Sequence, residues 1–268
     1  WMQGDTQYPE TTTYEISKQG EMPVSNISRI ALGKASKVLC ESVAPFDETR
    51  MMSPGVELAV FLTGWIGFRV IAEIVSYILV NFVGTNEYSL LILNYFSYGV
   101  LFLGIVGISF RFLPKLFKNV FRKEILFGLL VWLAILMFDG EWARIISMFQ
   151  ASTNINQTVV NGMIKQSPLL AIVFTGFIAP FCEEMTYRCG LFAFGSRINK
   201  VLAYVGTAFI FAFIHMHDFT SLNEWLNIPP YVFAGLAFCF AYDKWGLGAS
   251  LLAHVTNNTI AVLLTMAL

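Results

Sequence analysis

A succession of long apolar segments, beginning at Val56 and continuing to the C-terminus, constrains the fold of this chain more than any other feature. At a rise of about 1.5 Å per residue, each segment can cross or nearly cross a hydrocarbon core of about 30 Å. Because lipid offers the backbone no hydrogen bonds, such segments must fold as helices. The sequence therefore predicts an all-α, polytopic transmembrane helical bundle of about 7–8 helices. The predicted spans are approximately 56–82, 88–112, 124–139, 168–197, 200–217, 229–242 and 246–268, and an eighth would form if "EWARIISMFQ" or part of 150–166 entered the membrane.

The composition agrees with a membrane protein. Apolar residues make up 56% of the chain and charged residues 13%, whereas soluble domains carry about 25% charged residues. The net charge of -1 offers no basic surplus, so we expect no nucleic-acid partner. The four cysteines are scattered without CxxC spacing, which favours neither a disulfide scaffold nor a zinc site.

The N-terminal part of the chain differs from the rest. The stretch "GDTQYPETTTYEISKQGEMPVSN" is polar and lacks apolar periodicity. We therefore predict that residues 1–54 form an exposed extension, separate from a membrane core over 55–268. Within it, "ISRIALGKASKVLCESV" mixes apolar and basic residues. This pattern fits either a short amphipathic helix on the membrane surface or a linker. The extension leaves open a role in binding a protein partner.

Basic residues indicate the orientation in the membrane. The segment between the second and third predicted spans, "RFLPKLFKNVFRK", contains five basic residues and no acid, whereas "GTNEY" and "DGEW" are acidic. Basic loops stay in the cytoplasm. We therefore expect this loop, the turn "SRINK" and the N-terminus to be cytoplasmic.

Charged residues inside the predicted spans are candidates for function because their burial is costly. Arg69 and Glu73 are four residues apart and are expected to neutralise each other on one helix face. Glu184 and Arg188 have the same spacing and should also pair. Glu183 points about 100° away from Glu184 and has no basic residue three or four positions along. Glu183 is therefore the unpaired acid.

The distances to the cytoplasmic turn predict where Glu183 points. Glu183 lies 14 residues before Arg197, and His215 lies 15 residues after Lys200. In an antiparallel helix pair, Glu183 and His215 would sit at nearly equal depth and could share a water molecule. That geometry suits general-base activation of a nucleophile. Phe211 lies four residues before His215 and should pack on its ring.

The last span carries a further polar pair. His254 and Asn258 are four residues apart, with Asn257 slightly off the same face. Both side chains can donate hydrogen bonds, as a developing oxyanion requires. We interpret His217, Asn257 and the cysteines as structural or incidental. Glu183, His215, His254 and Asn258 could also form a buried polar network without catalysis.

Together these motifs resemble a known family. The motifs are EExxxR (Glu183, Glu184, Arg188), FxxxH (Phe211, His215) and HxxxN (His254, Asn258), in this order on consecutive apolar segments. In this respect the chain is similar to the CAAX-protease and bacteriocin-processing family, once called Abi. Its members are intramembrane glutamic endopeptidases and include the type II CAAX prenyl endopeptidases.

The resemblance implies roles for these residues. Glu183 would activate the attacking water, His215 would help to hold it, and His254 with Asn258 would stabilise the oxyanion. Glu184, Arg188 and Phe211 would support the site. The family is regarded as metal-independent, so no cofactor is expected. A second version of the mechanism, in which Glu183, His215 and His254 bind a catalytic zinc ion, ranks lower because no HExxH spacing is present.

The leading hypothesis is an intramembrane endopeptidase that acts near the cytoplasmic face on a peptide or protein substrate, which could carry a lipid. We expect a bacterial cytoplasmic membrane before an organellar or endoplasmic reticulum membrane, with lipid as the other partner. A different hypothesis is a non-catalytic scaffold or bacteriocin-immunity type protein that uses this fold and residues 1–54 to bind a partner. A transporter is a weaker hypothesis, since no inverted repeat is evident.

Overall fold

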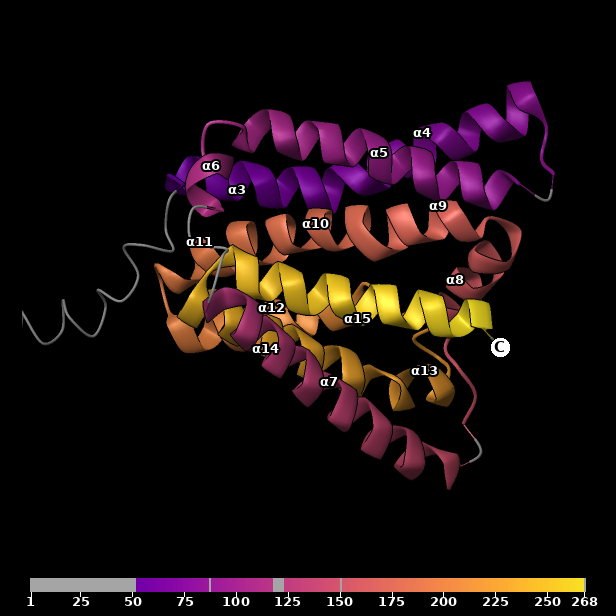
Figure 1. The fold of residues 1–268 in the computed structure, drawn as a ribbon. Helices are drawn as coiled ribbons and strands as arrows, with labels where there is room; N and C mark the ends of the chain where they lie inside the picture. Colours follow the sequence, from indigo (N-terminus) through magenta and orange to yellow (C-terminus); the bar gives the residue numbers. More distant parts are fainter. Residues whose placement is uncertain (1–51, 87, 118–122, 150, 268) are drawn as a thin grey trace, which may run out of the picture. The chain divides into compact units, whose positions relative to one another are not determined.

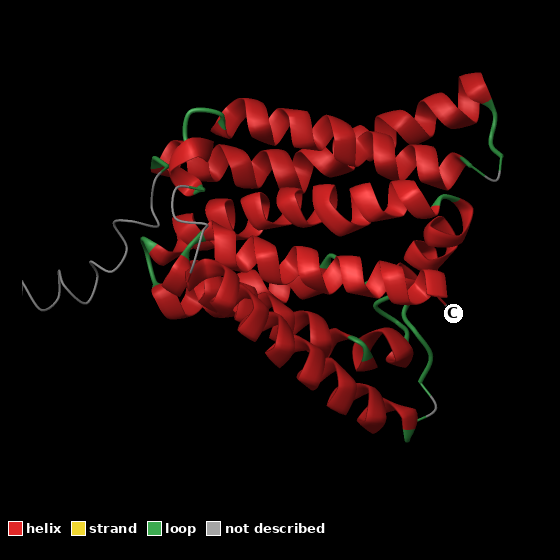
Figure 2. Ribbon diagram, viewed as in Figure 1, coloured by secondary structure: helices red, strands yellow, loops and turns green. Residues whose placement is uncertain are grey.

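The computed structural model of the chain describes residues 52–86, 88–117, 123–149 and 151–267. These residues belong to the compact unit Thr49–Leu268, and all their regular structure is helical (Figures 1 and 2). The prediction of an all-α fold is therefore confirmed. The predicted amphipathic segment, from Ile27 to Leu39, lies outside the described residues.

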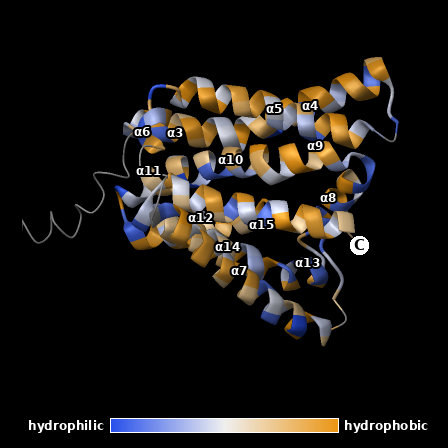
Figure 3. Cartoon of the chain, in the orientation of Figure 1, coloured by the Kyte–Doolittle hydropathy of each residue, from blue (hydrophilic) through white to orange (hydrophobic). Residues whose placement is uncertain are grey.

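Each of the seven predicted spans coincides with a helical segment. Six helices are long and apolar enough to cross a membrane, and Lys200–Phe213 is a shorter apolar helix. The chain is thus a membrane helical protein, with apolar residues along much of each of these six long helices (Figure 3). The helices are α3 (Pro54–Leu62), η2 (Thr63–Gly67), α4 (Phe68–Ile78), η3 (Leu79–Val83), α5 (Ser89–Ser109), α6 (Leu113–Leu116), α7 (Lys123–Ser147), α8 (Ile155–Gln166), α9 (Pro168–Val173), η4 (Phe174–Ile178), α10 (Ala179–Glu183), η5 (Glu184–Phe192), α11 (Ala193–Ser196), α12 (Lys200–Phe213), α13 (Leu222–Leu226), α14 (Ile228–Trp245) and α15 (Leu247–Ala267).

Two predicted boundaries were wrong. The third span continues to Ser147, so "EWARIIS" is the end of α7 and not a further crossing. The helix tolerates its polar end because Glu141 and Arg144 pair at 3.1 Å one turn apart. The fifth span ends at Phe213, four residues earlier than predicted. The chain then makes irregular turns, where Asp218 accepts hydrogen bonds from the backbone and hydroxyl of Thr220.

The helix Pro168–Ser196, built from α9, η4, α10, η5 and α11, lies at the centre of the described bundle. It contacts α3 and α5 on one side and α12, α14 and α15 on the other (Figure 1). The most apolar part of this helix is 44% buried, more than that of any other candidate span. A central helix can present side chains to several neighbours at once, and this one carries the EExxxR motif.

A glycine permits the close contact between the first span and the central helix. A Cβ atom at Gly64 would lie 1.8 Å from Oγ1 and 2.6 Å from Cβ of Thr186. Thr186 is buried, and its hydroxyl donates to the carbonyl of Cys182 at 2.6 Å. Small residues are what allow helices in membranes to approach so closely. Any side chain at position 64 must therefore displace the central helix.

We expect Gly64→Ala to destabilise the protein by about 1–3 kcal/mol through overpacking. Gly67→Ala is the matched control, since its Cβ would meet only a methyl group of Thr63 at 3.8 Å. Both changes raise helix propensity equally, so their difference isolates the contact. The midpoint of thermal unfolding in detergent, compared between the two variants, measures this difference in stability. Equal midpoints for the two variants would show that the helices are free to separate.

Candidate active site

The two adjacent glutamates lie where the central helix changes its winding. Glu183 is the last residue of α10 and Glu184 is the first residue of the π-helical segment η5. π-helical turns occur frequently at functional sites. The Glu184 side chain is completely buried, whereas 12% of the Glu183 side chain is exposed. The two carboxylates therefore lie in different environments.

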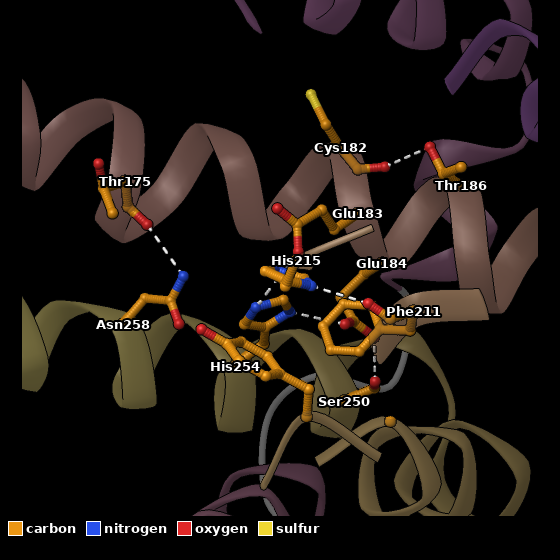
Figure 4. A network of polar contacts seen from close by, with 12 residues as sticks. Thr175, Cys182, Glu183, Glu184, Thr186, Phe211, His215, Ser250, His254 and Asn258 are labelled. Atoms are coloured by element: carbon orange, nitrogen blue, oxygen red, sulfur yellow. Dashed lines mark hydrogen bonds and ion pairs between the residues drawn. The ribbon is translucent and has the colours of Figure 1, made fainter. Parts of the chain in front are cut away.

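Glu184 is the centre of a buried polar cluster. Its Oε1 lies 3.1 Å from Nη1 of Arg188, which confirms the predicted pair. Oε1 also contacts Nδ1 of His254 at 2.8 Å, and Oε2 accepts a hydrogen bond from the hydroxyl of Ser250 (Figure 4). The last two contacts tie the central helix to α15. They were not predicted, because residues 66 and 70 positions away give no spacing signal.

Aromatic rings enclose this cluster. The Arg188 guanidinium lies 4.5 Å from the ring centre of Phe211 and 5.0 Å from that of Phe238. Phe238 also stacks on the ring of His254, with 4.5 Å between centroids and 18° between planes. These rings remove water from the ion pair and fix the orientation of His254.

Glu183 has two partners from other helices. Its Oε1 accepts a hydrogen bond from the hydroxyl of Tyr98 on α5 at 3.1 Å, and its Oε2 lies 3.7 Å from Nε2 of His254. No basic residue of its own helix pairs with it, as predicted. Nδ1 of His254 contacts the carboxylate of Glu184, which can only accept, so the ring proton lies on Nδ1. The other ring nitrogen, Nε2, faces Glu183. Tyr98 was missed, since a tyrosine in an apolar span has no pattern that marks it.

His215 lies just beyond the end of α12. Its Nδ1 is 2.7 Å from the carbonyl oxygen of Phe211. A carbonyl can only accept, so Nδ1 donates and the lone pair is left on Nε2. The ring also packs on Phe211, as predicted, at 4.9 Å between centroids and stacks on Tyr231 at 4.5 Å. The imidazole is thus held in one orientation.

Two cavities meet at His215. One, of 370 Å³, is lined by His215 together with His254 and Asn258. The other, of 240 Å³, is lined by His215 together with Glu183. The four predicted residues, Glu183, His215, His254 and Asn258, therefore line two adjoining cavities inside the bundle. Figure 4 shows these four side chains close to one another. Asn258 donates one amide hydrogen to the carbonyl of Thr175 at 3.2 Å.

One predicted ion pair was wrong. Arg69 and Glu73, both in the described part of the chain, are not joined by a salt bridge. Glu73 is exposed, and Arg69 lines the 240 Å³ cavity with Glu183 and Tyr98. Four-residue spacing places two residues on one face but does not decide which neighbour each one meets. His217, interpreted as incidental, also lines this cavity. Over the described ranges, no group of three or more His, Cys, Asp or Glu residues is arranged to hold a metal ion.

Comparison with known proteins finds a family domain that includes Glu183, His215, His254 and Asn258. Residues 165–260 match the family described as type II CAAX prenyl endopeptidase Rce1-like. An uncharacterised protein of Mycoplasma capricolum is 38% identical over 101 residues, which are 37% of this chain and 28% of that protein. The UPF0177 protein YvdC of Lactococcus lactis is 26% identical over 162 residues, which are 60% of this chain and 57% of that protein. The matches thus span between 28% and 57% of the length of these curated relatives. No solved structure matches the chain.

Proposed function

We propose that this chain, whose residues 165–260 form a type II CAAX prenyl endopeptidase Rce1-like domain, is an intramembrane endopeptidase. It hydrolyses a peptide bond of a membrane-associated or C-terminal peptide substrate with water activated by Glu183 and His215. The observation that carries the proposal is the convergence of Glu183, His215 and His254 on cavities inside the bundle. All three lie within the family domain.

The proposed reaction needs no covalent enzyme intermediate. Glu183 accepts a proton from water while the lone pair on Nε2 of His215 orients it. The resulting hydroxide attacks the carbonyl carbon of the substrate, and the C–N bond then breaks. Glu183 returns the proton to the leaving amine. The hydrogen bond from Tyr98 to Glu183 holds the carboxylate in place through this cycle.

In this proposal, side chains of the last helix, α15, stabilise the tetrahedral oxyanion. Asn258 uses one amide hydrogen on Thr175 and has a second one to donate. His254 can donate from Nε2 when its ring is protonated, and its Nδ1 is held by the buried carboxylate of Glu184 at 2.8 Å. Preorganised donors of this kind contribute about 10²–10³-fold in rate. In this proposal Glu184, Arg188 and Phe211 act by positioning.

The proposal includes the setting of the enzyme. The matched relatives are bacterial, which supports a bacterial cytoplasmic membrane. The basic loops favour an orientation in which these loops and the N-terminus lie on the cytoplasmic side. The substrate is a peptide or protein, with or without a lipid, and residues 1–54 are proposed to bind a protein partner. Catalysis is proposed to be metal-independent, and cleavage that persists after dialysis against a chelator would support this.

A comparison of small peptides and C-termini from cells producing the wild type or Glu183→Ala tests the function. Products that depend on Glu183 should be present only with the wild type. Glu73→Ala is the control, since Glu73 is an exposed glutamate of α4 outside both cavities. The scaffold hypothesis would be favoured if Glu183→Ala kept the cellular role while removal of residues 1–54 abolished it.

A further inference from the structure

The 370 Å³ cavity contains an acid that the proposed reaction does not use. Asp139 of α7 lines this cavity together with His215 and His254. The residues that line it include several neutral polar side chains but no lysine or arginine. The neutral polar residues include Thr153, Asn154, Gln157, Asn227 and Asn257. Asp139 is therefore the only carboxylate in that lining, and no cation of the described chain accompanies it.

The neighbours of Asp139 fix its position. Phe138 stacks on Phe233 of α14, with 4.2 Å between centroids and 6° between planes. One turn further on, Nε1 of Trp142 donates to the carbonyl of Leu226 at 2.8 Å. These two contacts hold α7 against α13 and α14 on either side of Asp139. The segment of α7 that carries Asp139 is thus held beside the cavity by packing.

One carboxylate oxygen has no partner. Among the described residues, Oδ1 of Asp139 is buried and accepts no hydrogen bond. Asp139 also lies inside the candidate membrane span Glu124–Ser147. A charge at such a place is costly unless another charge or donor satisfies it, and charged residues in spans mark binding sites and pathways. A donor on a molecule bound in the cavity would satisfy this oxygen.

Asp139 lies in the same cavity lining as His215 and His254, and this position indicates which kind of molecule would bind in the cavity. Tyr231 lines the same cavity and stacks on His215, while its hydroxyl accepts a hydrogen bond from Asn154 at 3.2 Å. A peptide that reaches His215 and His254 through this cavity would therefore pass Tyr231 and Asp139. Its backbone could meet the neutral amides, but only a positive charge would complement the carboxylate.

We propose that Asp139 forms a subsite for a cationic group of the substrate, either a lysine or arginine side chain or a free amino group. The subsite rests on the proposed function for its meaning, since it makes Asp139 a specificity-determining residue of the peptidase. Binding at the subsite does not require turnover.

Peptide binding to protein carrying Glu183→Gln in lipid nanodiscs tests the subsite without cleavage. The probes are two fluorescent apolar pentapeptides of equal length, one with a central lysine and one with norleucine. A charge-assisted hydrogen bond to a desolvated carboxylate should favour the lysine peptide by at least about tenfold. Adding Asp139→Asn should abolish that preference and leave binding of the norleucine peptide unchanged. Adding Glu141→Gln should alter neither affinity, because Glu141 is exposed and pairs with Arg144.

The outcomes separate the subsite from the reaction. Equal affinity for the two peptides, or an equal loss for both on Asp139→Asn, would overturn the subsite, provided the variant elutes as a folded species. Lysine preference that depends on Asp139, together with wild-type protein that cleaves neither peptide nor any cellular substrate, would retain the subsite and refute the peptidase. A free amino group is distinguished from a side chain by acetylating the N-terminus of each probe.

Discussion

Glutamine in place of Glu183 is expected to lower peptide cleavage by the purified protein about 10²–10⁴-fold without lowering its midpoint of thermal unfolding. Glutamine keeps an oxygen that can accept the hydrogen bond from Tyr98, which lies 3.1 Å from Glu183. The imidazole of His254 is beyond hydrogen-bonding distance, with its Nε2 3.7 Å from Oε2 of Glu183, so no close ion pair is lost. What disappears is the ability to take a proton from water.

The adjacent glutamate provides a matched comparison. Glu184→Gln removes the same charge one residue along the helix, but its carboxylate contacts Arg188, His254 and Ser250 in a fully buried cluster. We expect this variant to lose thermal stability, and activity with it. Rates at saturating substrate and unfolding midpoints, measured for both variants in one detergent, separate the two roles. Full activity of Glu183→Gln would refute its assignment as the base.

The sequence predicts the helical bundle and those contacts of the site that lie within one helix. Apolar length identifies helices because backbone groups in lipid must bond within their own segment. Spacing along one helix identifies the pair of Glu184 with Arg188, since geometry leaves them one turn apart. Neither source of information extends to contacts between helices. Tyr98 and Ser250 were missed for that reason.

The wrong predictions have the same origin. Arg69 and Glu73 have the spacing of a pair, yet the cavity beside Glu183 takes up Arg69. His215 was predicted on a helix, although α12 ends at Phe213. Its distance from Lys200 nevertheless brings it to the cavity that Glu183 lines. Depth along a span is thus more predictable than the neighbour that a side chain will meet, because packing between helices decides the latter.

Leucine in place of Arg188 is expected to destabilise the folded protein by about 3–5 kcal/mol, as is usual when one partner of a buried ion pair is removed. Arg188 and Glu184 are both fully buried, and their charged atoms lie 3.1 Å apart. The guanidinium also contacts Phe211 and Phe238. Without Arg188, Glu184 keeps only Ser250 and His254 as partners, and its charge is left uncompensated unless His254 becomes protonated.

A double variant separates the charge from the packing. Glu184→Gln combined with Arg188→Leu removes both charges, so we expect it to recover part of the lost stability. It should not recover activity, because the buried cluster that positions His254 and Phe211 would have lost both of its charged members. Arg144→Leu is the control, since that exposed pair with Glu141 is worth at most about 1 kcal/mol. If the double variant were no more stable than Arg188→Leu alone, the aromatic contacts of the guanidinium, and not its charge, would hold the central helix in place.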